Sequence, residues 1–306
     1  MRKSTSLTAL AVAALVTLSA CSNGSGSNAG GSTGSGGSQA AFDASTIKAD
    51  PAISALLPDK IKSAGKLVIG SDTSYAPAEF IGEDGKTPVG YDVDLAKAIG
   101  AVLGVQVEVQ NADFSSIIPA MGTKYDAGIS SFTITAEREQ VVNFVKYFNA
   151  GEAFAVAKGN PKGLGAADLC GTTMAVQTGT VEDDATGPLN DQCAAAGKKA
   201  INILRYTAQS DATTNLVGGK ADVMYADSPI VAYAIQQTGG QLEQLGEVIN
   251  SAPQGIAVAK ADTQLTDALQ KAVQKLIDDG TYLAILKSWN AEAGAVTTAE
   301  LNPAVS

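Results

Sequence analysis

The chain has 306 residues, 45% hydrophobic and 17% charged, which suffices for one large or two ordinary domains and excludes disorder throughout. Its formal net charge is −10; if Arg2 and Lys3 leave with a leader, 19 basic residues remain against 31 acidic ones and the charge becomes −12, so nucleic acid and anionic lipid are not expected partners. There is no histidine, the commonest general base and metal ligand, and we expect neither metal nor cofactor.

Residues 1–20 are predicted to be an export signal. Arg2 and Lys3 precede an apolar core at 7–18 that is short for a bilayer span, and small residues follow before Cys21. The ending LSAC resembles a bacterial lipobox, in which a signal peptidase cleaves before a cysteine that receives a diacylglycerol anchor. An ordinary signal peptide with an unmodified cysteine is the alternative. We expect lipidation of Cys21 and attachment to the outer face of the cytoplasmic membrane, the periplasmic side in a Gram-negative cell.

Residues 22–38 read SNGSGSNAGGSTGSGGS and contain no apolar side chain larger than alanine. Such a segment cannot bury enough surface to order itself, and seventeen residues of this kind reach about 21–25 Å (r.m.s.). We therefore expect a lipid-anchored linker over 21–38 and an N-terminal extension over 39–60. The linker would let a folded body move close to a membrane-bound partner.

From Lys66 the chain alternates apolar runs with helical periodicity. KLVIG at 66–70 and VQVEV at 105–109 are predicted strands. Three apolar residues between them lie at helical spacing: Leu95, Ile99 and Val102. This helix is expected to begin with Asp92 as its cap and to end at Gly104. The order strand, helix, strand indicates parallel βα units.

A weak internal repeat suggests two similar α/β lobes. MGTKYDAGISS at 121–131 aligns with VGGKADVMYAD at 217–227 at an offset of 96 residues. The aligned pairs are Gly122–Gly218, Lys124–Lys220, Asp126–Asp222 and Ser131–Asp227. Chance similarity at a turn between a helix and a strand is the alternative. Near the end of the chain, TQLTDALQKAVQKLIDDG at 263–280 predicts an amphipathic helix, and its apolar face is Leu265, Leu269, Ala272 and Leu276.

Two cysteines remain besides Cys21. Cys170 and Cys193 form an even pair in an exported chain, which favours a disulfide that closes a short loop and contributes about 3 kcal/mol to stability. Two buried free thiols are the alternative. The CxxC spacing of redox and zinc sites is absent, so neither of those roles is expected.

In an open parallel sheet, ligand loops lie at the carboxyl ends of the strands. Ten residues that follow predicted strands are expected to line a cleft between lobes: Asp72, Tyr75, Phe114, Ser130, Ser131, Thr133, Arg138, Gln177, Thr180 and Asp227. Arginine presents a planar fork that suits a carboxylate, and aspartate accepts from an ammonium group. Arg138 and Asp227 together therefore suit the two ends of an α-amino acid. The alternative for Arg138 is a surface pair with Glu137 or Glu139.

Four motifs resemble those of a known family, and they occur in its order and spacing. They read VGYDVDLAKAIG, DFSSIIPAMGTKYDAGISSFTITAERE, MAVQTGT and LIDDGTYLAILKSWN. The sequence resembles the polar amino-acid-binding proteins of ABC importers, which include the glutamine-binding and lysine/arginine/ornithine-binding proteins. The resemblance covers about Lys66 to Trp289. It implies an α/β, type II periplasmic-binding fold whose two α/β lobes are joined by two crossings, near 149–153 and 250–254. The expected boundaries are 61–152 plus 251–295 for the large lobe, 153–250 for the small lobe and 296–306 for a C-terminal tail.

The resemblance also implies roles for individual residues. Arg138 would clamp the ligand carboxylate and Asp227 would bind the α-ammonium group. The hydroxyl groups that would help Arg138 are those of Ser131, Thr133 and Thr180. Aromatic walls would come from Tyr75 and Phe114, although Ala78 stands where relatives commonly carry a larger residue. Gln177 lies where glutamine and basic-residue binders differ, so it does not decide between them.

Asp72 would meet the ligand side chain, which penalises acidic ligands and favours lysine, arginine, ornithine or an amide such as glutamine. If Asp72 only caps a loop and faces water, this inference fails. We expect a monomeric, non-enzymatic solute-binding protein that captures such an amino acid by hinge closure and delivers it to the membrane subunits of an ABC permease. The alternatives are a dehydratase-like lipoprotein enzyme on the same fold, with Asp72 or Asp227 as acid or base, and a sensor subunit that presents ligand to a receptor.

Overall fold

The computed structural model describes residues 42–305. The predicted signal, the lipidation site at Cys21 and the linker lie outside the described residues. Within 42–305, helices and strands alternate as an α/β protein, as the sequence predicts. None of the helices in this part of the chain is long and apolar enough to cross a membrane.

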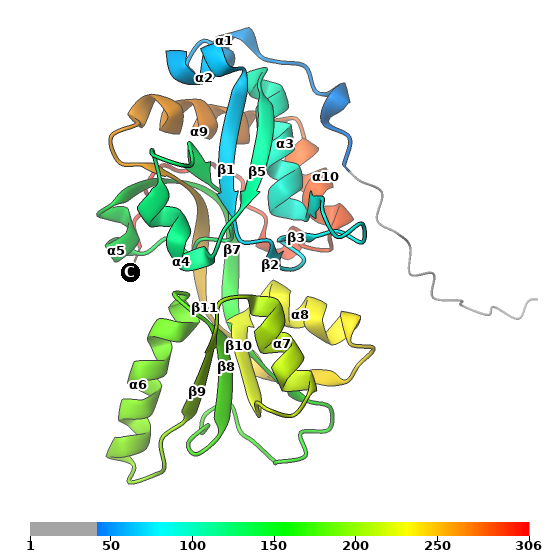
Figure 1. The fold of residues 1–306 in the computed structure, drawn as a ribbon, viewed down its shortest axis with the longest axis vertical. Helices are drawn as coiled ribbons and strands as arrows, with labels where there is room; N and C mark the ends of the chain where they lie inside the picture. The colour runs from blue at the N-terminus through cyan, green and yellow to red at the C-terminus, as the bar shows by residue number, and fades with distance from the viewer. Residues whose placement is uncertain (1–41, 306) are drawn as a thin grey trace, which may run out of the picture. The chain divides into compact units, whose positions relative to one another are not determined.

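One eight-stranded sheet runs through the body in the order β5-β1-β6-β11-β7-β10-β8-β9. The strands are β1 (Lys66–Ser71), β5 (Gln106–Asn111), β6 (Ala127–Gly128), β7 (Val142–Ala157), β8 (Thr173–Gln177), β9 (Asn202–Tyr206), β10 (Val223–Asp227) and β11 (Leu242–Ala259). β1 is parallel to β5 and β6, and β8 is parallel to β9 and β10, so the two ends of the sheet have the same arrangement. We call the elements around β1 the large lobe and those around β8 the small lobe (Figure 1).

The predicted repeat is confirmed in three dimensions. Asp126 stands just before β6 and accepts a hydrogen bond from Val68 N on β1, at 2.9 Å. Asp222 stands just before β10 and accepts the equivalent bond from Thr173 N on β8, also at 2.9 Å. Each aspartate therefore fixes the register between two parallel strands of its own lobe.

Helices flank the sheet in both lobes. Those of the large lobe are η1 (Ala44–Thr46), α1 (Pro51–Ser54), α2 (Asp59–Ala64), α3 (Tyr91–Leu103), α4 (Phe114–Ile117), η2 (Ile118–Ala120), α5 (Ala136–Glu139), α9 (Thr263–Asp278), α10 (Thr281–Ser288) and η3 (Glu292–Gly294). The small lobe has α6 (Val181–Ala195), α7 (Gln209–Val217) and α8 (Ser228–Gln237). The apolar faces predicted for α3 and α9 are buried. A separate sheet, β2 (Ser74–Tyr75), β3 (Glu79–Ile81) and β4 (Pro88–Val89), lies beside α3.

The predicted cap of α3 was wrong. The helix starts after Gly90, whose φ is +127° and where a Cβ atom would meet the carbonyl oxygen of Ala78 at 2.1 Å, so only glycine fits there. Asp92 lies inside the first turn and is buried. Its carboxylate turns inward and accepts from Ser131 N at 2.9 Å and Tyr147 OH at 2.6 Å, so tertiary contacts replace the expected capping bond.

β7 and β11 pair antiparallel and connect the two lobes (Figure 1). The register of this pair shifts between Leu245 and Ile249, between Ile249 and Ala252, and between Gln254 and Gly255. Opposite these irregularities, Gly151 has no room for a side chain, because a Cβ atom would lie 2.3 Å from Val248 Cγ1. The irregular stretch overlaps the crossings expected at 149–153 and 250–254. The lobe boundaries themselves stay a prediction.

Two further features brace the lobes. In the small lobe, Cys170 and Cys193 form the expected disulfide. In the large lobe, the end of the chain lies against β7, where Lys146 N donates to Glu300 O at 2.9 Å and Phe144 N donates to the Asn302 side chain at 2.8 Å. This part of the chain therefore covers backbone groups of β7 that β11 does not pair.

Candidate functional site

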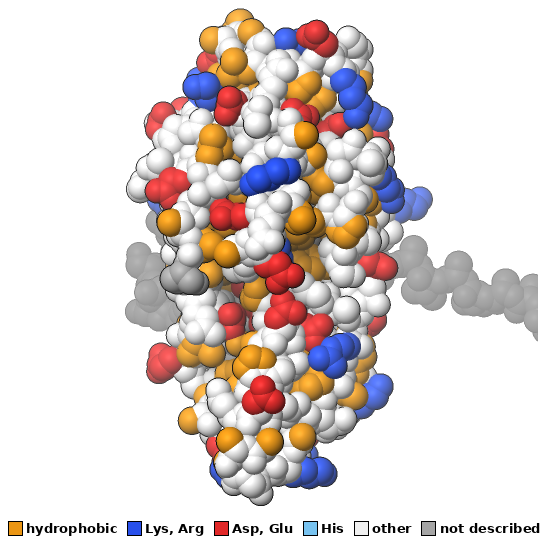
Figure 2. Space-filling view, turned by 90° about the vertical axis from the view of Figure 1, so that its left-hand side faces the viewer, with side chains coloured by type: hydrophobic (Ala, Val, Ile, Leu, Met, Phe, Trp, Pro, Cys, Tyr) orange, Lys and Arg blue, Asp and Glu red, His pale blue; other side chains and the backbone are white. Residues whose placement is uncertain are grey.

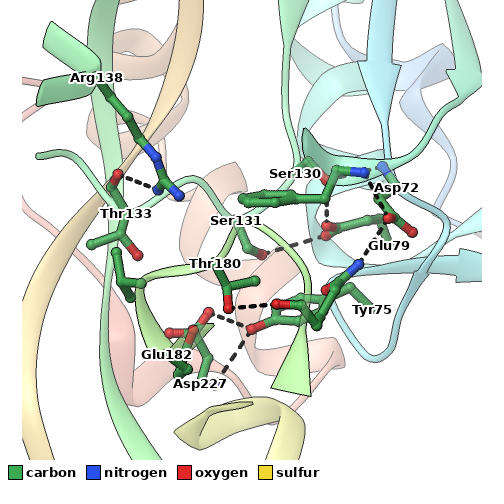
Figure 3. Close-up of a pocket in the computed structure, with 13 residues that line it drawn as sticks. Asp72, Tyr75, Glu79, Ser130, Ser131, Thr133, Arg138, Thr180, Glu182 and Asp227 are labelled. Atoms are coloured by element: carbon green, nitrogen blue, oxygen red, sulfur yellow. Dashed lines mark hydrogen bonds between the residues drawn. The ribbon is translucent and has the colours of Figure 1, made fainter. Parts of the chain in front are cut away.

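A narrow cavity lies between the two lobes, and its volume of about 10 Å³ in this structure is roughly that of one water molecule, so a ligand needs the lobes to move apart before it can enter. All ten residues predicted from the sequence line it, and they come from strand ends and the loops after them (Figure 3). Three lining residues were not predicted: Glu79, Val181 and Glu182. The rule on the carboxyl ends of strands therefore predicted which loops meet at this cavity, and the binding roles of their residues stay a prediction.

Arg138 lies in the short helix α5, whose N-cap Thr135 accepts from Arg138 N at 3.1 Å. Its guanidinium group donates to the carbonyl oxygens of Thr133 at 2.8 Å and Gly179 at 3.0 Å, and it lies over the Phe114 ring at 5.4 Å from the centroid. The bond to Gly179 reaches the small lobe. Burial lowers the pKa of Arg138, but an arginine side chain still stays charged. The cavity therefore carries one fixed cation.

Asp227 ends β10 on the opposite lobe from Arg138. Its Oδ2 accepts from Tyr75 OH at 2.8 Å and from Gln254 Nε2 at 2.9 Å. Burial, chiefly, raises the pKa of Asp227 to about 7, with a further upward contribution from the charge of Glu152. An ammonium group placed beside Asp227 would remove the cost of ionising this carboxyl in a buried site.

Asp72 both caps its loop and lines the cavity. Its Oδ1 accepts from Ser74 N at 3.1 Å and Ser74 Oγ at 2.7 Å, while its Oδ2 accepts from Phe114 N at 2.9 Å and Gln177 Nε2 at 2.8 Å. The side chain is buried, and burial raises the pKa of Asp72. The alternative in which Asp72 faces water is therefore excluded. Gln177 reaches Asp72 from the small lobe.

Four of the predicted residues carry hydroxyl groups, and hydrogen bonds or backbone geometry hold each of them in its loop. Ser130 accepts from Asp72 N at 2.9 Å, and Ser131 has a left-handed backbone with φ of +50°. Thr180 caps α6 by accepting from Asp183 N at 3.1 Å, and its own hydroxyl donates to Gln177 O at 2.9 Å. Thr133 forms an isolated bridge with Gln254 on β11. Contacts within the protein therefore hold these loops in this structure.

Glu79 is the most informative residue that sequence reasoning missed. It is fully buried on β3 and accepts from Ser130 Oγ at 2.8 Å and Ser131 Oγ at 3.4 Å. Burial and the neighbouring Asp92 raise the pKa of Glu79 well above its usual range. The alternation of β3, with Glu79 inward and Phe80 packed on Trp289, could have identified it. Glu182, in the first turn of α6, is readily mistaken for a solvated carboxylate at a helix start.

The lining residues include four carboxyl groups, on Asp72, Glu79, Glu182 and Asp227, against the single guanidinium group of Arg138. Figure 2 also shows acidic side chains close together in the middle of one face of the body. A site with this balance favours a guest that carries one carboxylate and more than one positive charge. Among residues 42–305, no group of histidine, cysteine or acidic residues is placed to hold a metal ion.

Comparison with known proteins agrees with the fold. Residues 67–292 match the family model for bacterial extracellular solute-binding proteins, family 3, and the chain belongs to this family. It is 36% identical to the arginine-binding protein ArgT of Corynebacterium glutamicum over 255 residues, which cover 82% of this chain and 83% of that protein.

Two solved structures have a fold similar to that of this protein. An ancestral arginine-binding protein bound to arginine superposes with a TM-score of 0.68 at 34% identity, covering 74% of this chain and 98% of that one. An ancestral arginine-binding protein bound to glutamine gives a TM-score of 0.68 at 35% identity, covering 74% and 99%. The type II periplasmic-binding fold is therefore confirmed, and the curated relative is a binding protein rather than an enzyme.

Proposed function

We propose that the cavity binds an L-amino acid with a cationic side chain and that L-arginine is the first candidate. The observation that carries this proposal is the arrangement of charges. Arg138 and Asp227 face the cavity from opposite lobes and suit the ligand carboxylate and α-ammonium group. Asp72 and Glu79 remain for a positively charged side chain. The arginine in the names of the relatives supports this choice, and the glutamine-bound structure supports an amide as the second candidate.

Capture would proceed by hinge closure about the irregular part of the β7–β11 pair. The proposed lobes are 61–152 plus 251–295 and 153–250, and closure would place the small-lobe Asp227 over a ligand already held by Arg138. We further propose that the mature chain is attached through Cys21 and hands its ligand to an ABC permease at the outer face of the cytoplasmic membrane. The export signal and linker of the sequence support this part of the proposal.

The role of Arg138 is tested by calorimetry with Arg138→Ala. We expect arginine to bind the variant about 10- to 100-fold more weakly, or worse, because a bidentate contact to the carboxylate is lost at a cost of about 1.5–3 kcal/mol. Lys158→Ala is the matched control: this lysine is exposed, pairs with Glu243, and should leave affinity unchanged.

A thermal-shift panel of the twenty amino acids, ornithine and citrulline tests the ligand class, because a ligand that binds the native state raises its melting temperature. We expect arginine to give the largest shift. Wild-type affinity for arginine in Arg138→Ala, or a panel in which acidic amino acids lead, would contradict the proposed site.

A further inference from the structure

Two carboxyl groups at one end of the cavity form a buried pair. Glu79 on β3 and Asp92 on α3 are both fully buried, and the hydroxyl group of Ser131 lies 3.4 Å from an oxygen of each. One hydroxyl group is thus within reach of both carboxyl groups. Glu79 lines the cavity, whereas Asp92 lies behind it. Two carboxylates this close cannot both be ionised cheaply away from water, so the pair holds a proton.

The hydrogen bonds indicate which member holds that proton. Asp92 Oδ2 accepts from Ser131 N at 2.9 Å and Tyr147 OH at 2.6 Å, which stabilises its charged form. Burial nonetheless raises the pKa of Asp92 to about 6, and burial with the charge of Asp92 raises the pKa of Glu79 well above its usual range. Oδ1 of Asp92 is buried and has no donor from another described residue. A proton on Glu79 would supply that donor.

Among residues 42–305, no lysine or arginine side chain forms a hydrogen bond with Glu79 or Asp92. The titratable and hydroxyl groups that face the pair are Tyr91 from α3, Tyr147 from β7, Tyr282 from α10, Ser130 and Ser131 after β6, and Asp72 after β1. The charge of Asp227 also contributes to the raised pKa of Tyr91, which faces the pair. Neither Glu79 nor Asp92 forms a salt bridge within residues 42–305. A counter-charge for Glu79 must therefore come from the ligand.

We propose that the Glu79–Asp92 pair keeps its proton when the bound ligand has a neutral side chain and releases this proton to solvent when the ligand side chain is cationic. The preference of the site for cationic over neutral ligands therefore depends on pH. This inference rests on the proposed function. A guanidinium or ammonium group beside Glu79 stabilises its carboxylate and expels the proton to water or buffer. An amide or urea oxygen instead accepts a hydrogen bond from the protonated carboxyl group. Glu79 is the specificity-determining residue, and Asp92 is a positioning residue that also bonds the Ser131 loop.

Arginine and citrulline provide the matched test, because they have nearly the same shape and differ in side-chain charge. Titration calorimetry of each ligand in two buffers with different ionisation enthalpies, between pH 6 and 8, gives the number of protons released on binding. Asp227 would release its proton to solvent when the α-ammonium group of either ligand binds beside it, so its contribution cancels in the difference.

We expect arginine to release about half to one proton more than citrulline, and the ratio of their affinities to rise with pH by up to about tenfold per unit. In Glu79→Gln, the excess release should vanish and the ratio should become independent of pH. Asp72→Asn is the control: it should weaken arginine binding but keep the pH slope of the ratio. Far-ultraviolet circular dichroism checks that each variant folds.

Equal proton release by the two ligands would overturn the inference and leave the proposed function intact. Excess release that persists in Glu79→Gln but is lost in Asp72→Asn would also overturn it, because the switch would then belong to Asp72. If neither ligand binds the wild-type protein, the proposed function fails and the inference fails with it.

Discussion

At the scale of single residues, buried carboxyl groups dominate the chemistry of the cavity. Arg138 and Asp227 could be predicted because each follows a strand at a motif position and because their charges complement an amino acid. Glu79 could not be found in the same way, because it lies on a short strand outside those loops and its partners Ser130 and Asp92 come from other segments. The sequence readily reveals which loops reach the cavity. It reveals less readily which face of a short strand points into the cavity.

The raised pKa of Asp227 predicts how stability depends on pH. The folded state binds this proton more tightly than the unfolded state, since the pKa is about 7 in the fold against 3.8 ordinarily. Stability should therefore fall as pH rises from about 4 to 7, by at most about 1.4 kcal/mol per unit for this group. Urea unfolding of the ligand-free protein between pH 5 and 8 measures the slope.

Asp227→Asn should flatten part of that slope, because the amide does not titrate but can still accept from Tyr75 and Gln254. Asp59→Asn, at the exposed start of α2, is the control and should leave the slope unchanged. A ligand-free protein whose stability rises steadily from pH 5 to 7, or an Asp227→Asn slope equal to that of the wild type, would contradict the assignment.

At the scale of elements, helical periodicity predicted both α9, which is buried on one side, and α3, which is buried on almost all sides. The apolar faces of α3 and α9 follow the helical repeat, and their residues pack as expected. The predicted N-cap of α3 was wrong, because the Asp92 side chain bonds Ser131 and Tyr147 from distant segments instead of capping the helix. The irregular pairing of β7 and β11 was likewise beyond sequence alone, because a register shift depends on both strands at once.

Gly151 tests whether this irregular pair matters for binding. In Gly151→Ala, the new methyl group would meet Val248 Cγ1 at 2.3 Å and the carbonyl oxygen of Ile249 at 2.9 Å. The side chain of Val248 can move but the backbone of Ile249 resists, so we expect about 1–3 kcal/mol of destabilisation. Arginine binding should also weaken, because the strands that join the lobes are distorted.

Chemical unfolding and calorimetry measure both effects. Gly187→Ala is the matched control, since this helical glycine has open space around it and the substitution should be neutral or stabilise by about 0.5–1 kcal/mol. Wild-type stability and affinity in Gly151→Ala would show that the crossing tolerates a side chain and does not constrain closure.

At the scale of the whole body, the lobes meet through hydrogen bonds across the cavity. Tyr75 bonds Asp227, Gln177 bonds Asp72, and Gln209 N donates to Ser74 Oγ at 3.0 Å. Protein groups already bond the side chains of both Arg138 and Asp227 in this structure. The net cost of closing an empty cleft is therefore smaller than charge burial alone suggests.

The α/β class, the two similar halves and the loops around the cavity could all be read from the sequence, because repeated patterns and strand ends are local features. The bonds between lobes could not, because their partners lie more than 100 residues apart, as Tyr75 and Asp227 do. Such pairs depend on how the two halves approach each other. A ligand must therefore replace or extend these bonds rather than fill an unpaired site.

A crystal structure of the protein grown with L-arginine tests the central claim most directly. We expect one arginine in the cavity, with its carboxylate on the Arg138 guanidinium group, its α-ammonium group within hydrogen-bond distance of Asp227, and its side chain directed toward Asp72 and Glu79. An arginine bound elsewhere, or bound in the reverse orientation with its guanidinium group on Asp227, would contradict the account.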